Sequence, residues 1–269
     1  MSDEHSYVTL PTGKCHVSYS EIKDWKLCSW RHKLKHVDKI SLDEPGVFLL
    51  FGTALHASCE DFLKTRVMKD DIAVEIITKG WIEHAKIDSF VKNNVDEFIN
   101  NARFILAEVE EFMNSTFPNW ECIDAEHALY EPIAEGKHAF KGFIDGIIAC
   151  DGKRGRVYWL LDWKTASWGW SMQKKTDEMV KAQLIFYKKF WSDKMNVEPK
   201  DVKCGFVLLK RTAKTGQRCE LVPVSVGDVS TGKTLKVLNG MIAGVKRNIA
   251  IKNRGSCEYC EYKGTPHCT

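Results

Sequence analysis

Apolar residues in the first half of the chain recur at three- and four-residue intervals, which is the spacing of amphipathic helices. Four segments show this pattern and are predicted to be helical: about 17–37, 53–67, 72–90 and 98–112. Ser18 or Ser20 is a suitable N-cap for the first helix, because a serine hydroxyl can accept a hydrogen bond from a free backbone N–H. Phe117-Pro118-Asn119 is predicted to end this helical half.

Beyond residue 120 the pattern changes to short apolar runs that are separated by turn residues, as in strands. These runs predict five strands, over about 121–133, 138–150, 156–163, 202–210 and 217–226. Two further helices are predicted, over about 172–191 and 231–249. Helices, a strand meander, a helix and further strands, in this order, are typical of an α/β protein.

The composition shows that the chain can form a core, but it does not identify a partner. Of the 269 residues, 44% are hydrophobic and 28% are charged, which is typical of a folded globular protein. The formal net charge of +3 is too small to indicate nucleic-acid binding by itself. The acidic groups of a metal site would offset part of a basic surface in this sum, so the net charge leaves both alternatives open.

Signals for export or membrane insertion are not apparent. The first ten residues contain no basic segment followed by an apolar one, and no apolar run approaches the eighteen or so residues of a membrane span. We therefore expect a cytoplasmic protein without membrane contact, whose cysteines are thiols or metal ligands rather than disulfides. Six cysteines in mostly apolar segments are interpreted as packing residues: Cys15, Cys59, Cys122, Cys150, Cys204 and Cys219.

Charged residues interrupt two of the predicted strands. Asp145 lies in the apolar run 140–148, and the next strand ends in Asp162-Trp163-Lys164. Burying these charges is costly unless they pair or bind an ion. Two carboxylates can hold Mg²⁺ or Mn²⁺, which activates water for phosphodiester hydrolysis, and a lysine beside them can stabilise developing charge. For Asp162 and Lys164 alone, a structural ion pair is the favoured alternative.

Other groups suited to such chemistry lie on predicted helices. His56 and Glu60 are one turn apart on one helix, and Gln183 and Tyr187 are one turn apart on a later helix. Neither pair is specific by itself. A lone histidine is more often structural, and amphipathic helices often carry glutamine and tyrosine.

Together, and in this order, these residues resemble the PD-(D/E)XK nuclease superfamily and, within it, the RecB-like exonucleases. The resemblance implies an α/β fold with a restriction-endonuclease-like core, in which helices flank a mixed central sheet. It implies a single domain over 1–269. Its expected parts are a helical N-terminal cap at about 1–118, the catalytic sheet and helix at about 119–226, and a C-terminal helix with a cysteine-rich tail at about 227–269.

The resemblance also assigns a role to each candidate residue. The implied ligands of Mg²⁺ or Mn²⁺ are His56, Asp145, Asp162 and the main-chain carbonyl of Trp163. Glu60 is expected to support this site. Lys164 would position the attacking water, and Gln183 and Tyr187 would contact DNA or the catalytic groups.

The implied activity is that of a DNA exonuclease in recombination, repair or phage DNA processing, in a bacterial or phage-infected host cell. Its substrate would be single-stranded DNA or duplex ends. A separate helicase, recombinase or single-strand-binding protein is the expected partner. The alternative from another class is a non-catalytic DNA-binding module of the same fold.

The tail contains Cys257, Cys260 and Cys268, a spacing that suits metal or cluster ligands. AddB nuclease domains and CRISPR-adaptation exonucleases, which this chain resembles, take a fourth cysteine from the N-terminal helix. Cys28 occupies that place here. The implied cofactor is a four-iron four-sulfur (4Fe-4S) cluster that joins the two chain ends. Zn²⁺ is the alternative, and His267 could then replace one ligand.

Two further patterns carry weaker signals. Residues 227–234 match the phosphate-binding Walker A pattern, but the short remainder of the chain lacks a strand ending in an aspartate for Mg²⁺. A strand-to-helix turn capped by Ser230 or Thr231 is therefore favoured over a P-loop ATPase. Three tryptophans near the Asp-x-Lys motif can stack on unpaired bases or pack internally: Trp163, Trp168 and Trp170.

Overall fold

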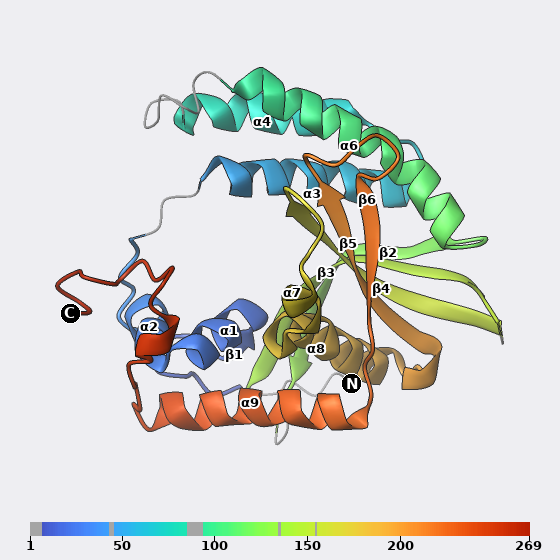
Figure 1. The fold of residues 1–269 in the computed structure, drawn as a ribbon. Coiled ribbons are helices and arrows are strands. Elements are labelled where there is room, and N and C mark those ends of the chain that lie inside the picture. The colour runs from blue at the N-terminus through green and yellow to red at the C-terminus, as the bar shows by residue number, and fades with distance from the viewer. Residues whose placement is uncertain (1–6, 43–45, 85–93, 134–135, 154) are drawn as a thin grey trace.

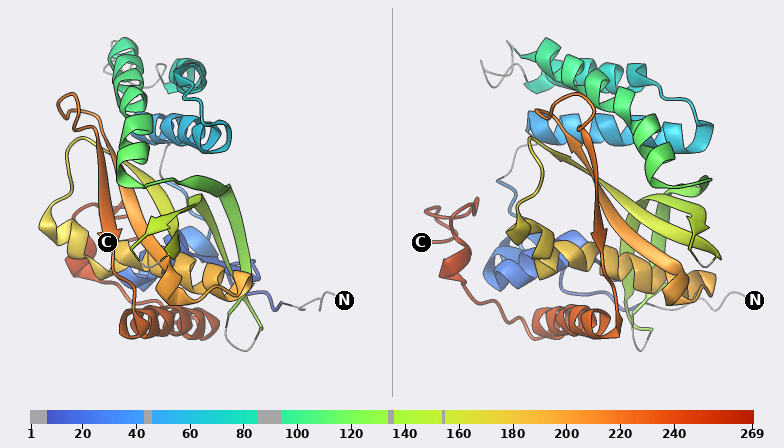
Figure 2. Two further views of the ribbon diagram at one scale, coloured as in Figure 1. Left: turned by 90° about the vertical axis from the view of Figure 1, so that its right-hand side faces the viewer. Right: turned by 45° about the vertical axis from the view of Figure 1, so that its right-hand side comes forward.

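The structure, a computed structural model, describes residues 7–42, 46–84, 94–133, 136–153 and 155–269. A six-stranded mixed sheet lies between two layers of helices (Figure 1). The layer above the sheet in Figure 1 consists of α3 (Val47–Thr65), α4 (Asp70–His84) and α6 (Val95–Thr116). The layer below it consists of α1 (Tyr19–Leu27), α8 (Glu178–Met195) and α9 (Asp228–Lys246). Two turned views show the same layers (Figure 2), so the predicted α/β fold with a flanked mixed sheet is confirmed.

The long strand β3 organises the sheet. The strands are β1 (His16–Ser18), β2 (Glu121–Pro132), β3 (Ala139–Gly152), β4 (Gly155–Ala166), β5 (Val202–Lys210) and β6 (Cys219–Val224). Their order is β1-β3-β4-β5-β6, and β2 pairs with the other edge of β3. The β1–β3 and β4–β5 pairs are parallel, and the other pairs are antiparallel.

Each face of the sheet is covered by its own apolar cluster. On the α3 side, Phe62 and Ile105 pack with Trp163 of β4. On the α8 side, Phe140 of β3 stacks on Phe190 with ring centroids 4.6 Å apart. Complete burial of one such side chain contributes about 1.5–3 kcal/mol. Clusters on both faces therefore fix β3 and β4, the strands that carry the predicted acidic residues.

The N-terminal segment differs from the single helix predicted over 17–37. Its first residues form β1, so the predicted helical cap also supplies one strand of the sheet. Ser18 caps α1 as predicted, because its hydroxyl accepts a hydrogen bond from the Glu21 N–H. At Cys28 the backbone is extended (φ −161°, ψ 110°), which ends α1. A short α2 (Ser29–His32) and a π-helical turn η1 (Lys33–Val37) follow.

Other helix boundaries also move. The helix predicted over 53–67 begins already at Val47, directly after Gly46. The helix predicted over 72–90 corresponds to α4, and its last predicted residues lie outside the described residues. The helix predicted over 172–191 is two helices, α7 (Met172–Thr176) and α8, because Asp177 caps a new helix start.

All predicted strands are present, with small shifts at their ends. Two short 3₁₀ turns complete the described elements: η2 (Pro199–Asp201) between α8 and β5, and η3 (Arg254–Ser256) after α9. Within the described ranges, none of the helices combines the length and the apolar character that a membrane span needs.

Candidate active site

The sheet opens between β3 and β4, and the two predicted aspartates lie at the opening. The two strands pair from the hairpin turn up to Gly146 and Leu161. Asp145 and Asp162 are the next residues beyond this last pair. Here Oδ2 of Asp145 accepts a hydrogen bond from the Trp163 N–H at 2.7 Å, so a side chain replaces a strand carbonyl. Both carboxylates therefore lie where the strands diverge, within reach of helices from both layers.

Helix α3 brings His56 to this gap. Its Nδ1 lies 3.4 Å from Oδ2 of Asp145, and its ring lies close to the main chain of Trp163. α3 can approach because Gly52 has no side chain, since a Cβ there would lie 3.3 Å from Oγ1 of Thr165. Burial lowers the pKa of His56 and so favours the neutral imidazole, the form that binds metal ions.

Asp162 is almost completely buried, and its two oxygens contact different groups. The Nζ of Lys164 lies 2.6 Å from Oδ2, and Nε2 of Gln183 donates to Oδ1 at 2.6 Å. Burial alone would lower the pKa of Lys164, but the carboxylates of Asp162 and Asp145 raise it above its ordinary value. The lysine therefore stays protonated, and its side chain keeps 34% exposure toward solvent.

The pair Gln183 and Tyr187 reaches the site from α8. Nε2 of Gln183 also donates to the Tyr187 hydroxyl at 3.1 Å. Tyr187 packs against Gly142 of β3, where a Cβ would come within 2.8 Å of the tyrosine ring. Burial and the charge of Asp162 raise the pKa of Tyr187, so its hydroxyl stays protonated. The pair therefore holds Asp162 from the face of the sheet opposite His56.

The charge at the gap suits a divalent cation. Burial, and then the negative charge of Asp162, raise the pKa of Asp145 well above its usual value. Carboxylate oxygens and a neutral imidazole are donors that Mg²⁺ and Mn²⁺ accept. In the described residues, however, no three His, Cys, Asp or Glu side chains are arranged around a common ion position. Both oxygens of Asp162 are instead engaged by Lys164 and Gln183.

One acidic residue at the site escaped prediction. Glu126 of β2 has φ +55°, a left-handed conformation that is rare for a non-glycine residue. Its two neighbours pair with the residues on either side of Asp145, which places Glu126 opposite that aspartate. Its charge contributes to the raised pKa of Asp145, and burial and Glu60 raise the pKa of Glu126 itself. Glu60, the predicted supporting residue, forms an ion pair with Lys64.

Comparison with known proteins identifies the family. The family model of the PD-(D/E)XK nuclease superfamily matches residues 16–265. The chain belongs to this superfamily. A search of curated proteins found no match.

Among solved structures, this PD-(D/E)XK chain is similar to a protein from Eubacterium rectale described as "Putative exonuclease". The TM-score is 0.53 at 12% sequence identity, and the similarity covers 98% of this chain and 93% of the other. At this identity the similarity shows the fold alone. Together with the family match, it agrees with the expected restriction-endonuclease-like core. Nucleases of this superfamily act on DNA and generally use divalent metal ions.

Four cysteines of the PD-(D/E)XK chain line one cavity of about 380 Å³: Cys28, Cys257, Cys260 and Cys268. None of the four is part of a disulfide, and Sγ of Cys28 accepts a hydrogen bond from the Asn253 N–H at 3.3 Å. His267, the alternative ligand, is not among the residues that line the cavity. Of the six cysteines assigned to packing, three are buried and three are half-buried.

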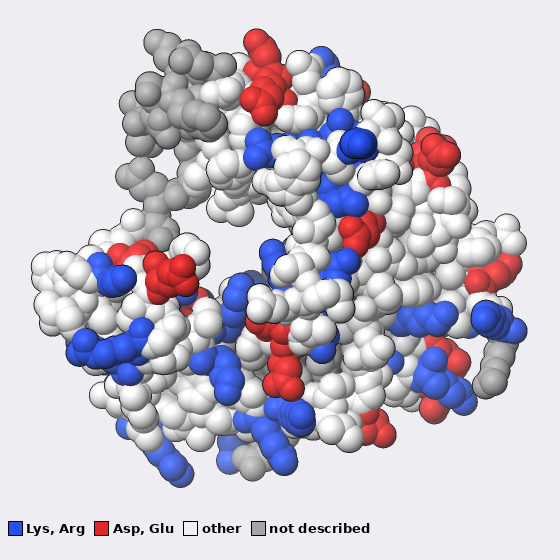
Figure 3. Space-filling view, viewed as in Figure 1, with Lys and Arg blue, Asp and Glu red and all other residues white. Residues whose placement is uncertain are grey.

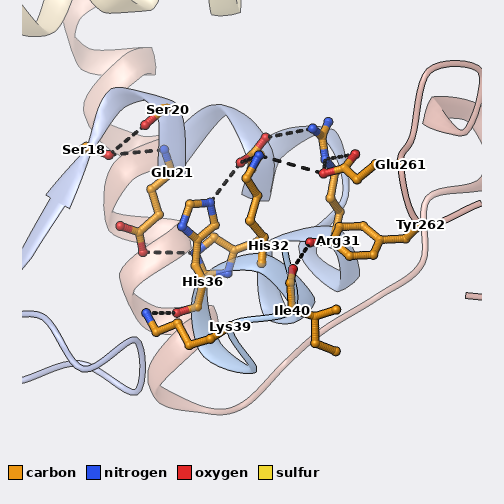
Figure 4. Close-up of polar contacts among 12 residues, drawn as sticks. Ser18, Ser20, Glu21, Arg31, His32, His36, Lys39, Ile40, Glu261 and Tyr262 are labelled. Carbon is orange, nitrogen blue, oxygen red and sulfur yellow. Dashed lines mark hydrogen bonds and ion pairs between the residues drawn. The ribbon is translucent and has the colours of Figure 1, made fainter. Parts of the chain in front are cut away.

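Polar contacts tie the cysteine tail to the N-terminal helices (Figure 4). Arg31 and the carboxylate of Glu261 form an ion pair at 3.0 Å, and the Tyr262 hydroxyl donates to the main-chain carbonyl of Ile40. These contacts bring the tail to the N-terminal helices, around the cavity that the four cysteines line.

The Walker A match does not form a phosphate-binding loop, so the P-loop alternative is wrong. α9 begins at Asp228, inside the motif, with Gly227 as its N-cap rather than Ser230 or Thr231. The Thr231 N–H already bonds to the Gly227 carbonyl at 3.0 Å. The N–H groups from residue 232 onward are therefore used within the helix and cannot surround a phosphate.

Proposed function

We propose that this PD-(D/E)XK protein is a metal-dependent DNA exonuclease. The observation that carries the proposal is the gap between β3 and β4, where two buried carboxylates, a histidine and a protonated lysine meet. The proposed ligands of Mg²⁺ or Mn²⁺ are His56, Asp145, Asp162 and the main-chain carbonyl of Trp163. The bound ion would polarise the phosphodiester and lower the pKa of a water molecule.

The protein groups then have separate tasks. Lys164 is protonated, so it acts as a donor that orients the attacking water and stabilises the charge on the phosphate oxygens. Gln183 donates to one oxygen of Asp162 and fixes the rotation of that carboxylate. Tyr187 supports Gln183 through its hydroxyl. Hydrolysis breaks the bond between phosphorus and the leaving oxygen, and releases a nucleotide when it occurs at an end.

The exonuclease assignment predicts a dependence on DNA ends. With Mg²⁺ or Mn²⁺, the protein should release short products from end-labelled linear DNA and leave covalently closed circles intact. A chelator should stop the reaction. Equal rates on circles and linear DNA would make the protein an endonuclease. Binding without cleavage of any DNA form would instead support the non-catalytic DNA-binding module.

Such an exonuclease would serve recombination, repair or phage DNA processing. Within the domain proposed over 1–269, the cap, the sheet and the tail each contribute to one site or to its support. Unwinding of a duplex substrate would be left to a separate helicase, with a recombinase or single-strand-binding protein as further partners.

For the cysteine tail, the proposal is a 4Fe-4S cluster held by Cys28, Cys257, Cys260 and Cys268. Two observations support it: the shared cavity and the N–H group that donates to Cys28. In iron–sulfur proteins, N–H···S hydrogen bonds help to set the reduction potential of the cluster. The cluster would take no part in hydrolysis. It would join the N-terminal helices to the C-terminal tail, and so stabilise the helical layer that contains α1.

This proposal predicts that anaerobically purified protein is brown and contains iron and sulfide in equal amounts. Cys260→Ser should lose most of the iron and unfold at a lower temperature, because cluster binding contributes to the folding free energy. Cys15→Ser, which changes a half-buried thiol away from the cavity, should keep both. A colourless preparation with one zinc per chain would favour Zn²⁺, and a metal-free preparation would contradict both forms.

A further inference from the structure

Helix α3 runs beside the end of β4 with a regular correspondence. His56 contacts the main chain at Trp163, and Gly52, one turn earlier, approaches Thr165. The two elements therefore run in opposite directions with similar spacing. One helical turn of α3 rises by about 5.4 Å, and two residues of β4 rise by about 6.6 Å. Phe48 lies one further turn back, on the same helix face. It should therefore adjoin the segment that follows β4.

Arg211 shows that Phe48 does adjoin this segment. Its guanidinium lies 5.2 Å from the centroid of the Phe48 ring, and its Nη2 donates to Oγ of Ser167 at 3.3 Å. Ser167 precedes Trp168. Phe48 is 58% exposed and Trp168 is 67% exposed. Phe48 therefore lies beside the segment that carries Trp168, and both rings are exposed to solvent.

Trp168 differs from the other tryptophans near the motif. Trp163 is buried in the α3-side cluster, and Trp170 packs on Phe206 with centroids 5.0 Å apart. The segment that carries Trp168 is held by main-chain hydrogen bonds to residues 211–212. The ring of Trp168 is therefore presented to solvent from a fixed backbone, although burying it would be favourable.

Positive charge lies on the same side of the molecule. Burial, and then the positive charges of Lys23 and Lys164, lower the pKa of Lys174. The Lys174 ammonium of α7 therefore lies within electrostatic range of Lys23 on α1 and of Lys164 on β4, and its Nζ lies 4.6 Å from the centroid of the Trp170 ring. Figure 3 shows Lys and Arg side chains on the lower right border of a hollow between the two helical layers, with acidic side chains on its left border. Cations beside exposed rings suit a strand with charged phosphates and unpaired bases.

We propose that Phe48 and Trp168 stack on the bases of an unpaired DNA strand whose phosphates lie along Lys23, Lys174 and Arg211. The inference rests on the proposed nuclease function and specifies its substrate as a single-stranded end. Paired bases in a duplex already stack on one another and cannot offer their faces. Phe48 is eight residues from His56, about 12 Å along α3, so the stacked bases lie a few nucleotides from the cleaved phosphate.

The test measures binding, not cleavage, in a Lys164→Ala background with Mg²⁺ present. Fluorescence anisotropy of a labelled oligothymidylate should show affinity reduced by about 5- to 150-fold for Phe48→Ala and for Trp168→Ala, as stacking strengths predict. Trp168→Phe should recover much of this loss. Phe104→Ala is the matched control, because Phe104 is also an exposed ring beneath an arginine, Arg218, but on α6.

Two further measurements separate stacking from charge. The ring variants should leave the slope of log affinity against log salt unchanged, whereas Lys174→Ala should reduce it by about 0.7. An abasic strand should bind the parent and Trp168→Ala equally. Unchanged affinity in both ring variants, or equal losses for the abasic and the normal strand, would overturn the proposal.

The nuclease function and the stacking site can be tested separately. Cleavage of DNA by a protein whose Phe48 and Trp168 variants bind normally would refute the stacking site alone. Ring-dependent binding by a protein that cleaves no DNA would refute the nuclease function and support the stacking site.

Discussion

Lys164→Ala should slow DNA hydrolysis by at least about a hundredfold, the lower end of the loss for groups that move protons or stabilise developing charge. The ammonium lies 2.6 Å from Asp162 and faces the solvent side of the gap, so its removal takes away a donor beside the reacting phosphate. Metal binding should persist, because the carboxylates then lose a competing cation. Single-turnover cleavage and metal-dependent thermal stabilisation are to be measured on one preparation.

Lys79→Ala provides the matched control. This exposed lysine of α4 pairs with Glu75 and is outside the gap, so its removal changes the same charge without touching the site. It should cleave DNA at the wild-type rate. Wild-type cleavage by Lys164→Ala would contradict the assigned role. If Lys164→Ala lost both DNA cleavage and stabilisation by metal, Lys164 would organise the metal ligands instead of acting in the chemical step.

Asp145→Asn should make the metal-free protein more stable than the wild type at neutral pH. The pKa of Asp145 is raised by burial and by Asp162, so the folded protein binds this proton more tightly than the unfolded chain. Tighter proton binding by the folded protein contributes to its stability. This contribution is complete below the ordinary aspartate pKa, near 4, and is lost as pH rises through the raised pKa of Asp145. The difference in favour of the Asp145→Asn variant should therefore grow from about pH 4 toward neutrality, reaching a few degrees in Tm.

Divalent metal should reverse this order. Binding to the folded state alone stabilises by about 2.7 kcal/mol at a hundred times the Kd, and the variant loses a ligand. Mg²⁺ or Mn²⁺ should thus raise the Tm of the wild type much more than that of the variant. Asp151→Asn, an exposed aspartate on the same strand, should show neither effect. If metal-free Asp145→Asn protein were less stable than the wild type at pH 7, the charge of Asp145 would not destabilise the metal-free fold.

The spacing of apolar residues predicted which helices and strands form better than it predicted where they begin and end. Alternation placed Asp162 and Lys164 on one strand, and the structure has them there as an ion pair. The break before α8 was missed, because the apolar spacing continues across Asp177. That residue caps the new helix by accepting hydrogen bonds from two N–H groups. β1 was missed because three residues are too few to show a period.

The arrangement of the site depended on long-range pairing, which spacing along the chain does not contain. The opening between β3 and β4 arises because β1 occupies the edge of β3 that β4 leaves. Asp145 and Asp162 meet there only through this exchange of partners. Glu126 was missed for a similar reason, since its place opposite Asp145 follows from strand register and a left-handed backbone. The family resemblance supplied His56, which its helix pattern alone would not have singled out.

The most direct test of the account is the metal dependence of cleavage in the wild type and in Asp162→Asn. The variant keeps the size of a side chain that is 2% exposed, but removes its charge. A labelled single-stranded DNA is incubated with each protein over a range of Mn²⁺ and Mg²⁺ concentrations. The wild-type rate should rise with metal and saturate, while the variant should stay at the background of the metal-free reaction. Intact DNA in the presence of metal and wild type, or equal cleavage by both proteins, would contradict this expectation.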